Sequence, residues 1–272
     1  MTAPASPLAR ATTWIAILVG ASLSGTACKI SAEARPEVPK EIIVFVDFSQ
    51  SMGGENWALI ERDFREAIIP SLDAGDRLLI APINEETLTG FHPLLDTTFP
   101  EKPVFNGWED NTLRHNRELK AVDAEIERLR AEVRSKVPEL LSKTAASRKT
   151  DIFSSLLMAQ KLFDREPRRK VLILMSDMIV DYGPYRFDRI DWSVEKNQEL
   201  LRELEAKGLI PDLTDVCVYV SAVSAGSAEL AGQISAFWRA YFRLTNADLD
   251  PSRYAHVLLH WPPSTGCPSS DA

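Results

Sequence analysis

The chain has 272 residues, of which 45% are hydrophobic and 26% are charged, the composition of an ordinary globular protein. Its 31 Lys and Arg residues against 39 Asp and Glu residues give a net charge of −8. No basic excess is therefore present to neutralise nucleic-acid phosphates or to bind an anionic membrane surface broadly. Three cysteines are too few for a dense disulfide framework or a four-ligand zinc site, so those classes are excluded.

Residues 1–34 have the pattern of an export signal followed by a linker. Arg10 precedes an apolar run from Trp14 to Leu23, which is about half of the ~20 residues that a membrane-spanning helix needs. Small residues and then Cys28 follow, as at a bacterial lipoprotein cleavage site. Two outcomes remain open: lipidation of Cys28, or ordinary cleavage after Ala27 or Ala34. We expect an exported protein, either free in the periplasm or held at the membrane as a lipoprotein.

Apolar and amphipathic segments alternate along the rest of the chain. Nearly continuous apolar runs are typical of strands buried on both faces, and a repeat of three to four residues is typical of helices. The predicted strands are 41–49, 77–83, 171–175, 216–223 and 255–260, and the predicted helices are 57–69, 151–163, 195–207 and 228–244. This alternation predicts an α/β domain over 35–262, with a doubly wound, mostly parallel sheet flanked by helices, and a disordered tail at 263–272.

A charged segment at about 109–137 interrupts this alternation. Its apolar residues are three and four positions apart, as on one side of a helix: Leu119, Val122, Ile126, Leu129 and Val133. Pro138 is expected to end or kink this helix, which would be roughly 43 Å long. Two interpretations remain open. The inserted helix lies along the domain through its apolar stripe, or it projects as an arm that pairs with a partner or with a second copy of the chain.

Short oxygen-bearing side chains follow the predicted strands where they end. Asp47, Ser49 and Ser51 follow the first strand, and Asp177 follows the strand at 171–175. Ligands of an open parallel sheet collect beyond the carboxyl ends of its strands, so these side chains are expected at one rim. An all-oxygen set suits a hard cation such as Mg²⁺. Between these two strands in the sequence, Thr150 and Asp151 open a predicted helix after a polar loop.

These residues resemble the von Willebrand factor type A domain and its metal-ion-dependent adhesion site. The matches are the D-x-S-x-S run of Asp47, Ser49 and Ser51, the Thr of a second loop at Thr150, and the Asp of a third loop at Asp177. The resemblance implies that these five residues hold Mg²⁺, Mn²⁺ or Ca²⁺. It also implies that an acidic side chain of a protein partner fills the vacant position of the cation.

The chain departs from the family pattern in two loops. Residues 146–149 stand where the family often has glycines before the Thr, and Met178 stands where it often has a glycine after the third-loop Asp. Asp151, beside Thr150, is expected either to cap the following helix or to act as a further ligand.

Aromatic residues and an arginine follow the strand that ends at Asp177. Tyr182, Tyr185 and Arg186 are residue types favoured at interfaces, and they are expected near the metal. Two interpretations stay open: they border the partner-binding surface, or they pack back on the domain.

The predicted function is therefore a non-enzymatic, metal-dependent protein-binding module of the cell envelope. One alternative is an envelope scaffold that assembles through the inserted helix. The other is a metal-dependent phosphatase, which would need a second carboxylate two residues after Asp47, where the chain has Ser49. Cys217 is interpreted either as a buried small residue or as one half of a disulfide with Cys267.

Overall fold

The computed structural model describes residues 38–85, 87–107, 111–144 and 146–263. The predicted export signal with Cys28, and the predicted tail beyond residue 263, lie outside this part of the chain. Within the described residues, no helix has both the length and the apolar character needed to cross a membrane.

The centre of the domain is a five-stranded sheet in the order β3-β2-β1-β4-β7. β1 (Lys40–Asp47) pairs in parallel with β2 (Arg77–Ile83) and with β4 (Arg169–Met175), and β4 pairs in parallel with β7 (Val216–Ser221). At one edge, β3 (Leu95–Thr98) runs antiparallel to β2. The chain moves from β1 to β2 on one side and later returns to place β4 on the other side of β1, so the predicted doubly wound, mostly parallel sheet is confirmed.

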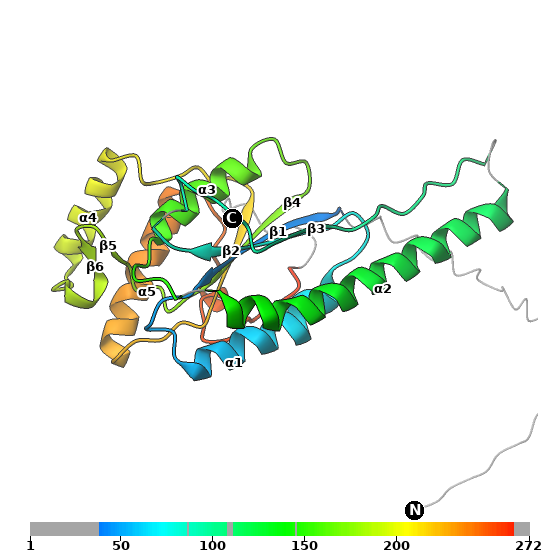
Figure 1. The fold of residues 1–272 in the computed structure, drawn as a ribbon. Helices are drawn as coiled ribbons and strands as arrows, with labels where there is room; N and C mark the ends of the chain where they lie inside the picture. Colours follow the sequence, from blue (N-terminus) through cyan, green and yellow to red (C-terminus); the bar gives the residue numbers. More distant parts are fainter. Residues whose placement is uncertain (1–37, 86, 108–110, 145, 264–272) are drawn as a thin grey trace, which may run out of the picture. The chain divides into compact units, whose positions relative to one another are not determined.

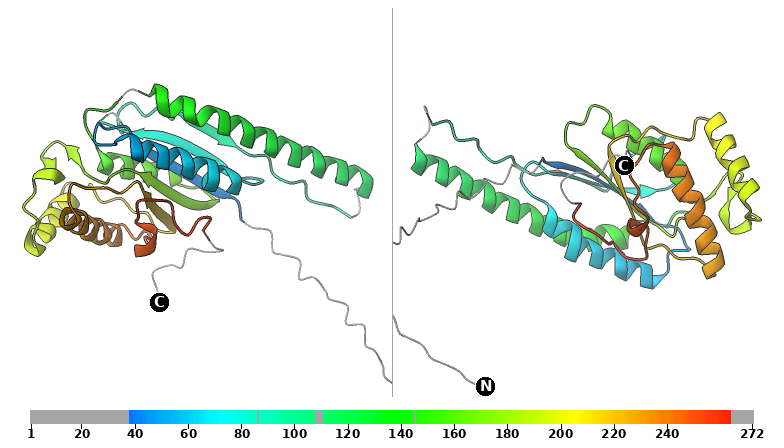
Figure 2. Two further views of the ribbon diagram at one scale, coloured as in Figure 1. Left: turned by 90° about the horizontal axis from the view of Figure 1, so that it is seen from below. Right: turned by 180° about the vertical axis from the view of Figure 1, so that it is seen from behind.

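Helices cover both faces of this sheet (Figure 1 and Figure 2). One face packs against α1 (Gly54–Asp63), which continues as a π-helical turn at Phe64–Ile68 and a 3₁₀ turn at Ile69–Ser71, and against α2 (Thr112–Lys143). The other face packs against α3 (Ile152–Phe163), α4 (Val194–Ala206) and α5 (Ala228–Leu244). Alternate residues of the four parallel strands point into the two cores, which explains why these strands are nearly continuous apolar runs in the sequence.

The inserted helix α2 lies along the domain over its C-terminal half. Ile126, Val133 and Val137 are buried in the core beside α1, and the Arg130 guanidinium donates hydrogen bonds to the Leu72 carbonyl oxygen. The first turns extend beyond these contacts, and Leu113 is largely exposed. The apolar stripe is therefore used within the domain from Val122 onward.

Pro138 does not end the predicted helix. α2 continues for five further residues to Lys143, and Leu140 and Leu141 pack partly against the core beyond the proline. Burial of these side chains offsets the loss of one backbone hydrogen bond at the proline.

The predicted strand at 255–260 is wrong. An isolated bridge joins Tyr254 to Val220 of β7, and Ala255 and His256 make three backbone hydrogen bonds with residues 220–223, but no strand forms. The backbone then leaves the sheet: the Leu258 N–H donates to the Asp63 carboxylate on α1 at 3.0 Å, and Trp261 Nε1 donates to the Ala67 carbonyl oxygen at 3.1 Å. Packing on the α1 side replaces strand pairing because Leu258 and Trp261 join that core.

Cys217 is fully buried in β7 and is disulfide-bonded. The other two cysteines of the chain, including the predicted partner Cys267, lie outside the described residues. The pairing itself therefore stays a prediction.

Candidate functional site

The five predicted ligands lie at the C-terminal ends of β1 and β4, which are neighbours in the sheet. Asp47 is the last residue of β1, and Ser176 and Asp177 directly follow β4. The chain departs to opposite sides of the sheet from these two strands, which makes this rim the switch point of a doubly wound sheet. The location is the one predicted.

The Asp47 carboxylate is fully buried and held by neighbouring donors. Its Oδ1 accepts the Ser49 backbone N–H at 2.8 Å, and its Oδ2 accepts the Ser176 hydroxyl at 2.7 Å. Burial raises the pKa of Asp47, while hydrogen bonds from Ser176, Ser49 and Thr150 act in the opposite direction. The Thr150 and Ser49 hydroxyls are thus both within reach of Asp47.

The Asp177 carboxylate lies beside Asp47 and shares its environment. Its Oδ1 accepts the Ile179 backbone N–H at 2.9 Å. Burial and the negative charge of Asp47 raise the pKa of Asp177 to about 6, and a hydrogen bond from the Ser51 hydroxyl opposes this rise. Two buried carboxylates therefore repel each other at this rim, and a cation between them would relieve that repulsion.

The loop before α3 brings Thr150 to the same rim. The Ser147 N–H donates to the Phe48 carbonyl oxygen at 3.0 Å, which joins this loop to the end of β1. Thr150 and Asp181 exchange two backbone hydrogen bonds, of 3.3 and 3.2 Å, which join it to the segment after β4. Thr150 is consequently buried between the two strands that carry the carboxylates.

The three hydroxyl residues face one cavity of about 500 Å³. Ser49, Ser51 and Thr150 line it, and the Ser49 and Ser51 hydroxyl oxygens are 2.8 Å apart. Asp47 and Asp177 are buried and do not line the cavity. The structure therefore brings all five predicted residues together, with the hydroxyl-bearing residues on the cavity side.

The donor set fits a hard divalent cation. Hydroxyl and carboxylate oxygens are the ligands that Mg²⁺, Mn²⁺ and Ca²⁺ take, and Mg²⁺ is commonly held by one or two carboxylates with water completing its shell. Among the residues that the structure describes, no cluster of three or more His, Cys, Asp or Glu side chains could hold a metal. A site at this rim thus depends on the serine and threonine oxygens as well as on the two carboxylates.

Asp151 caps α3. Its carboxylate accepts the Ser154 backbone N–H at 3.0 Å and the Ser154 hydroxyl at 2.5 Å. Both of its oxygens are engaged within the first turn of the helix, as expected of an N-cap residue. Of the two roles expected from the sequence, helix capping or metal ligation, Asp151 has the capping role in the structure.

Met178 adopts the left-handed conformation that glycine takes without strain. Its φ is +65°, which costs a residue with a side chain about 1–2 kcal/mol. The side chain is fully buried, and the carbonyl oxygen accepts Trp238 Nε1 at 2.9 Å. Core packing and this hydrogen bond hold the turn after Asp177 in place without a glycine.

Tyr185 does not border the cavity. Tyr182 and Tyr185 lie on a short hairpin formed by β5 (Asp181–Tyr182) and β6 (Tyr185–Arg186). Tyr185 is buried, packs edge-on against Phe153 at 5.5 Å, and donates its hydroxyl to Glu203 at 3.2 Å. It packs back on the domain because its ring completes the core over α3, so its placement in the partner-binding set is corrected.

Tyr182 and Arg186 remain partly exposed near the rim. The Lys149 ammonium lies 5.6 Å from the centre of the Tyr182 ring, and Arg186 pairs with Asp181 at 2.6 Å. Asp181 itself lines the cavity that the hydroxyls face. The two side chains are therefore placed where contact with a partner is feasible.

The sequence analysis did not identify Ser176 as a residue of the site. Its hydroxyl donates to Asp47 Oδ2 and accepts the Met178 N–H at 2.9 Å, so it ties the two carboxylate-bearing loops together. The signal was its position directly after an apolar strand and before Asp177, the same position that identified the aspartate.

No protein-family model and no curated protein sequence matches the chain. Several solved structures are similar to it. The manganese-loaded TRAP protein of Plasmodium vivax is 17% identical, with 73% of this chain and 63% of that chain covered and a TM-score of 0.35. The pilus adhesin SpaC of Lactobacillus rhamnosus GG, in an open conformation, is 12% identical, with 81% and 28% covered and a TM-score of 0.40. The ArnB paralog VWA2 of Sulfolobus acidocaldarius is 13% identical, with 79% and 43% covered and a TM-score of 0.37.

This chain thus spans less than two thirds of the length of each of these three proteins. Similarities of this size assign neither a metal nor a function to it.

Proposed function

We propose that this protein is a von Willebrand factor A-like binding module that holds a divalent cation and uses it to bind an acidic group of a protein partner. The observation that carries the proposal is the convergence of three hydroxyls and two buried carboxylates on one rim, listed as Asp47, Ser49, Ser51, Thr150 and Asp177. Mg²⁺ is the expected ion, with Mn²⁺ and Ca²⁺ as alternatives of the same oxygen-binding class.

The arrangement of the site supports binding by an outside ligand. The hydroxyl-bearing residues line an open cavity, while the two carboxylates are buried and do not line it. Asp47 and Asp177 would supply the negative charge that attracts the cation, and Ser49, Ser51 and Thr150 would orient towards it on the cavity side. A bound cation supplies a positive charge at the floor of the cavity, to which a partner carboxylate is attracted.

We further propose that the module works outside the cytoplasm. The support is the signal-like segment before Cys28, together with the net charge of −8, which offers no alternative grip on nucleic acid. Anchoring through a lipid on Cys28 or release into the periplasm are the two forms that this segment predicts.

Metal binding is tested by thermal unfolding of the purified protein with Mg²⁺, Mn²⁺ and Ca²⁺. A cation that binds only the folded state raises the midpoint temperature. At a cation concentration one hundred times the dissociation constant, the free energy of unfolding increases by about 2.7 kcal/mol. Asp47→Ala is expected to lose this response, and so is Thr150→Val, which removes only a hydroxyl.

Asp63→Asn is the matched control. Asp63 is another buried carboxylate that accepts a serine hydroxyl, from Ser221 at 2.6 Å, but it lies at the end of α1 and does not line the cavity. The control is expected to keep the full response to cations. Equal midpoint shifts in the wild type, Asp47→Ala and Thr150→Val would refute the site.

A further inference from the structure

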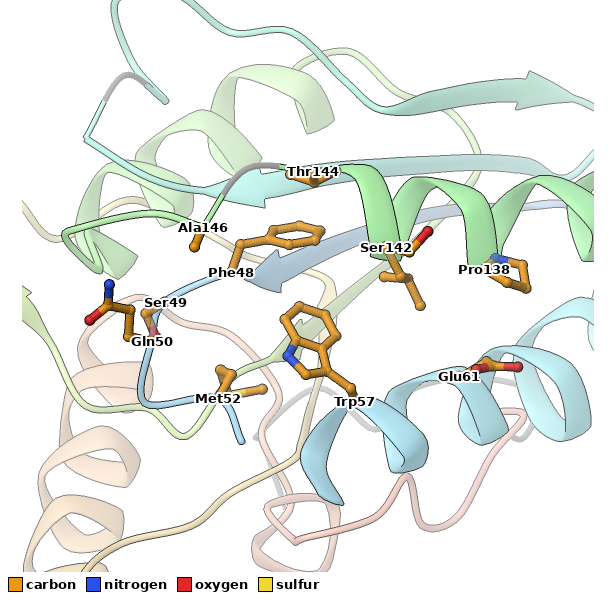
Figure 3. A pocket seen from close by; sticks show the side chains of 11 residues that line it. Phe48, Ser49, Gln50, Met52, Trp57, Glu61, Pro138, Ser142, Thr144 and Ala146 are labelled. Atoms are coloured by element: carbon orange, nitrogen blue, oxygen red, sulfur yellow. The ribbon is translucent and has the colours of Figure 1, made fainter. Parts of the chain in front are cut away.

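A second cavity, of about 510 Å³, lies between the start of α1 and the end of α2, beside the candidate metal site (Figure 3). Most of its wall is apolar, formed by the side chains of Phe48, Met52, Trp57, Pro138, Leu141 and Ala146. Its volume lies within the range of pockets that bind ligands. None of these six apolar side chains is a proposed metal ligand, whereas Ser49, which also lines the cavity, is one.

The wall is held in shape by the surrounding core. The rings of Phe48 and Trp57 are 5.1 Å apart, and Phe48 and Met52 are almost completely buried beneath the surface. Across the cavity, the end of α2 is fixed because Val133 and Val137 are buried in the domain. The inserted helix therefore forms one side of a cavity that exists before any partner arrives.

The apolar cavity is continuous with the candidate metal site. Ser49 and Gln50 line both cavities, so the loop after β1 forms their common border. Figure 3 shows Trp57 at the middle of the wall, with Phe48 above it, Met52 beside it and Ser49 farther out on the same side. A partner segment that reaches the hydroxyls of the metal site can thus reach Trp57 as well.

The charge at this border favours an acidic segment. Arg148 and Lys149 are exposed on the loop before α3, and Arg148 lines the cavity that the hydroxyls face. Asp181 and Asp188 line the same cavity, but both form ion pairs with Arg186, at 2.6 and 3.6 Å. Glu61, the one acidic side chain among the described residues that line the apolar cavity, forms an ion pair with Arg65 at 3.4 Å. Basic groups beside an apolar cavity match a partner that carries negative charge next to a hydrophobic side chain.

We propose that this cavity receives a large apolar side chain, such as Leu, Met, Phe or Trp, from the same partner segment that presents its acidic group to the metal site. This inference rests on the proposed function and adds a second determinant to it. The partner is thereby defined as a protein segment with an acidic residue and a bulky apolar residue at a fixed spacing. Buried aromatic or aliphatic anchors of this kind supply most of the affinity of an interface.

The test begins with a displayed library of random twelve-residue peptides selected on the purified protein in Mg²⁺. The recovered peptides are expected to share an acidic residue and a large apolar residue at constant spacing. Replacing that apolar residue by Ala is expected to weaken binding at least about tenfold. Recovered peptides without a common apolar residue would overturn the proposal.

The cavity itself is tested with Ser142→Trp, which adds bulk from α2 into it, and with Ser135→Trp as the matched control. Both serines are exposed on α2 and donate their hydroxyl to the carbonyl oxygen three residues earlier, Ser142 to Glu139 at 3.0 Å and Ser135 to Glu132 at 2.8 Å. Of the two, Ser142 lines the cavity. We expect the Kd of the selected peptide to rise at least about tenfold in Ser142→Trp and to stay unchanged in Ser135→Trp.

A second variant, Trp57→Ala, removes the centre of the wall without adding bulk, and it is expected to weaken the same peptide. Circular dichroism and the Mg²⁺-induced midpoint shift show that each variant is folded and keeps its metal site. Equal affinity of the wild type, Ser142→Trp and Trp57→Ala, with binding abolished by EDTA, would overturn the cavity proposal and leave the proposed function intact. Peptide binding that persists in EDTA would instead overturn the proposed function.

Discussion

In the metal-free protein, the Asp177→Asn substitution is expected to stabilise the fold, although it removes a proposed ligand. Asp177 is almost completely buried, and burial together with the charge of Asp47 raises its pKa from 3.8 to about 6. Each pKa unit corresponds to about 1.4 kcal/mol, so ionised Asp177 destabilises the folded state by about 3 kcal/mol at neutral pH. Asn is isosteric and can still accept the Ile179 N–H through its side-chain oxygen.

The sign of the pH dependence follows from the same shift. Because the folded protein binds this proton more tightly than the unfolded chain, the free energy of unfolding falls as the pH rises from about 4 to about 6. Above about pH 6 the free energy of unfolding does not fall further through this group. Asp177→Asn removes this part of the pH dependence, so the variant and the wild type should differ most at pH 7 and above.

The assay is urea unfolding at pH 7.5, in EDTA and in saturating Mg²⁺. In EDTA the free energy of unfolding of the variant should exceed that of the wild type by up to about 3 kcal/mol. In Mg²⁺ only the wild type should gain stability, so the difference between the two proteins narrows or reverses. A variant that is less stable than the wild type in EDTA would refute the idea that burial and the charge of Asp47 make ionised Asp177 unfavourable in the folded protein.

Two further predictions concern the fold away from the site. Glu41 is fully buried, and burial raises its pKa to about 7 despite the ion pair with Arg77 at 3.1 Å. The free energy of unfolding should therefore fall as the pH rises from about 4.5 to about 7. Glu41→Gln should remove this fall, which is worth up to about 3 kcal/mol. Identical slopes of stability against pH in the two proteins would contradict this. Val133→Ala should lower the free energy of unfolding by about 2 kcal/mol because the Val133 side chain is buried where α2 packs on the domain. Arg134 is exposed on the same helix, and Arg134→Ala should change the free energy of unfolding by less than about 0.5 kcal/mol. Equal effects of these two changes in denaturant melts would show that α2 does not pack on the core.

The central strands could be predicted because burial on both faces leaves a strong mark on composition. Ile42 to Val46 and Val171 to Met175 are uninterrupted apolar runs, and both are strands in the middle of the sheet. The site followed from these strands, since Asp47 and Asp177 come at their ends and parallel strands end at one rim. The positions of the two carboxylates could therefore be predicted from the local sequence.

Features that depend on tertiary contacts could not be predicted in this way. Residues 255–260 are as apolar as a strand, but the segment leaves the sheet because Leu258 and the neighbouring Trp261 pack on the α1 side, a contact that a one-dimensional pattern does not reveal. The edge strand β3 has a single buried residue, Leu95, and so left almost no signal. The burial of Tyr185 follows from a contact with Phe153, which lies 32 positions earlier in the chain.

The loop that carries Thr150 is an intermediate case. The threonine was found through its family resemblance, whereas its position follows from backbone hydrogen bonds to Phe48 and Asp181 made by this loop. These bonds join segments about 100 and about 30 residues away in sequence, respectively, and no local pattern encodes them. Sequence identified the chemistry, and the long-range contacts determined the geometry.

The most direct test of the metal site is an anomalous difference map from crystals of the protein grown with Mn²⁺. The account predicts one strong peak per chain at the rim of β1 and β4, with Ser49, Ser51 and Thr150 oxygens around it and the carboxylates of Asp47 and Asp177 beneath. A map without a peak at this rim, or with its strongest peak elsewhere on the chain, would contradict the account.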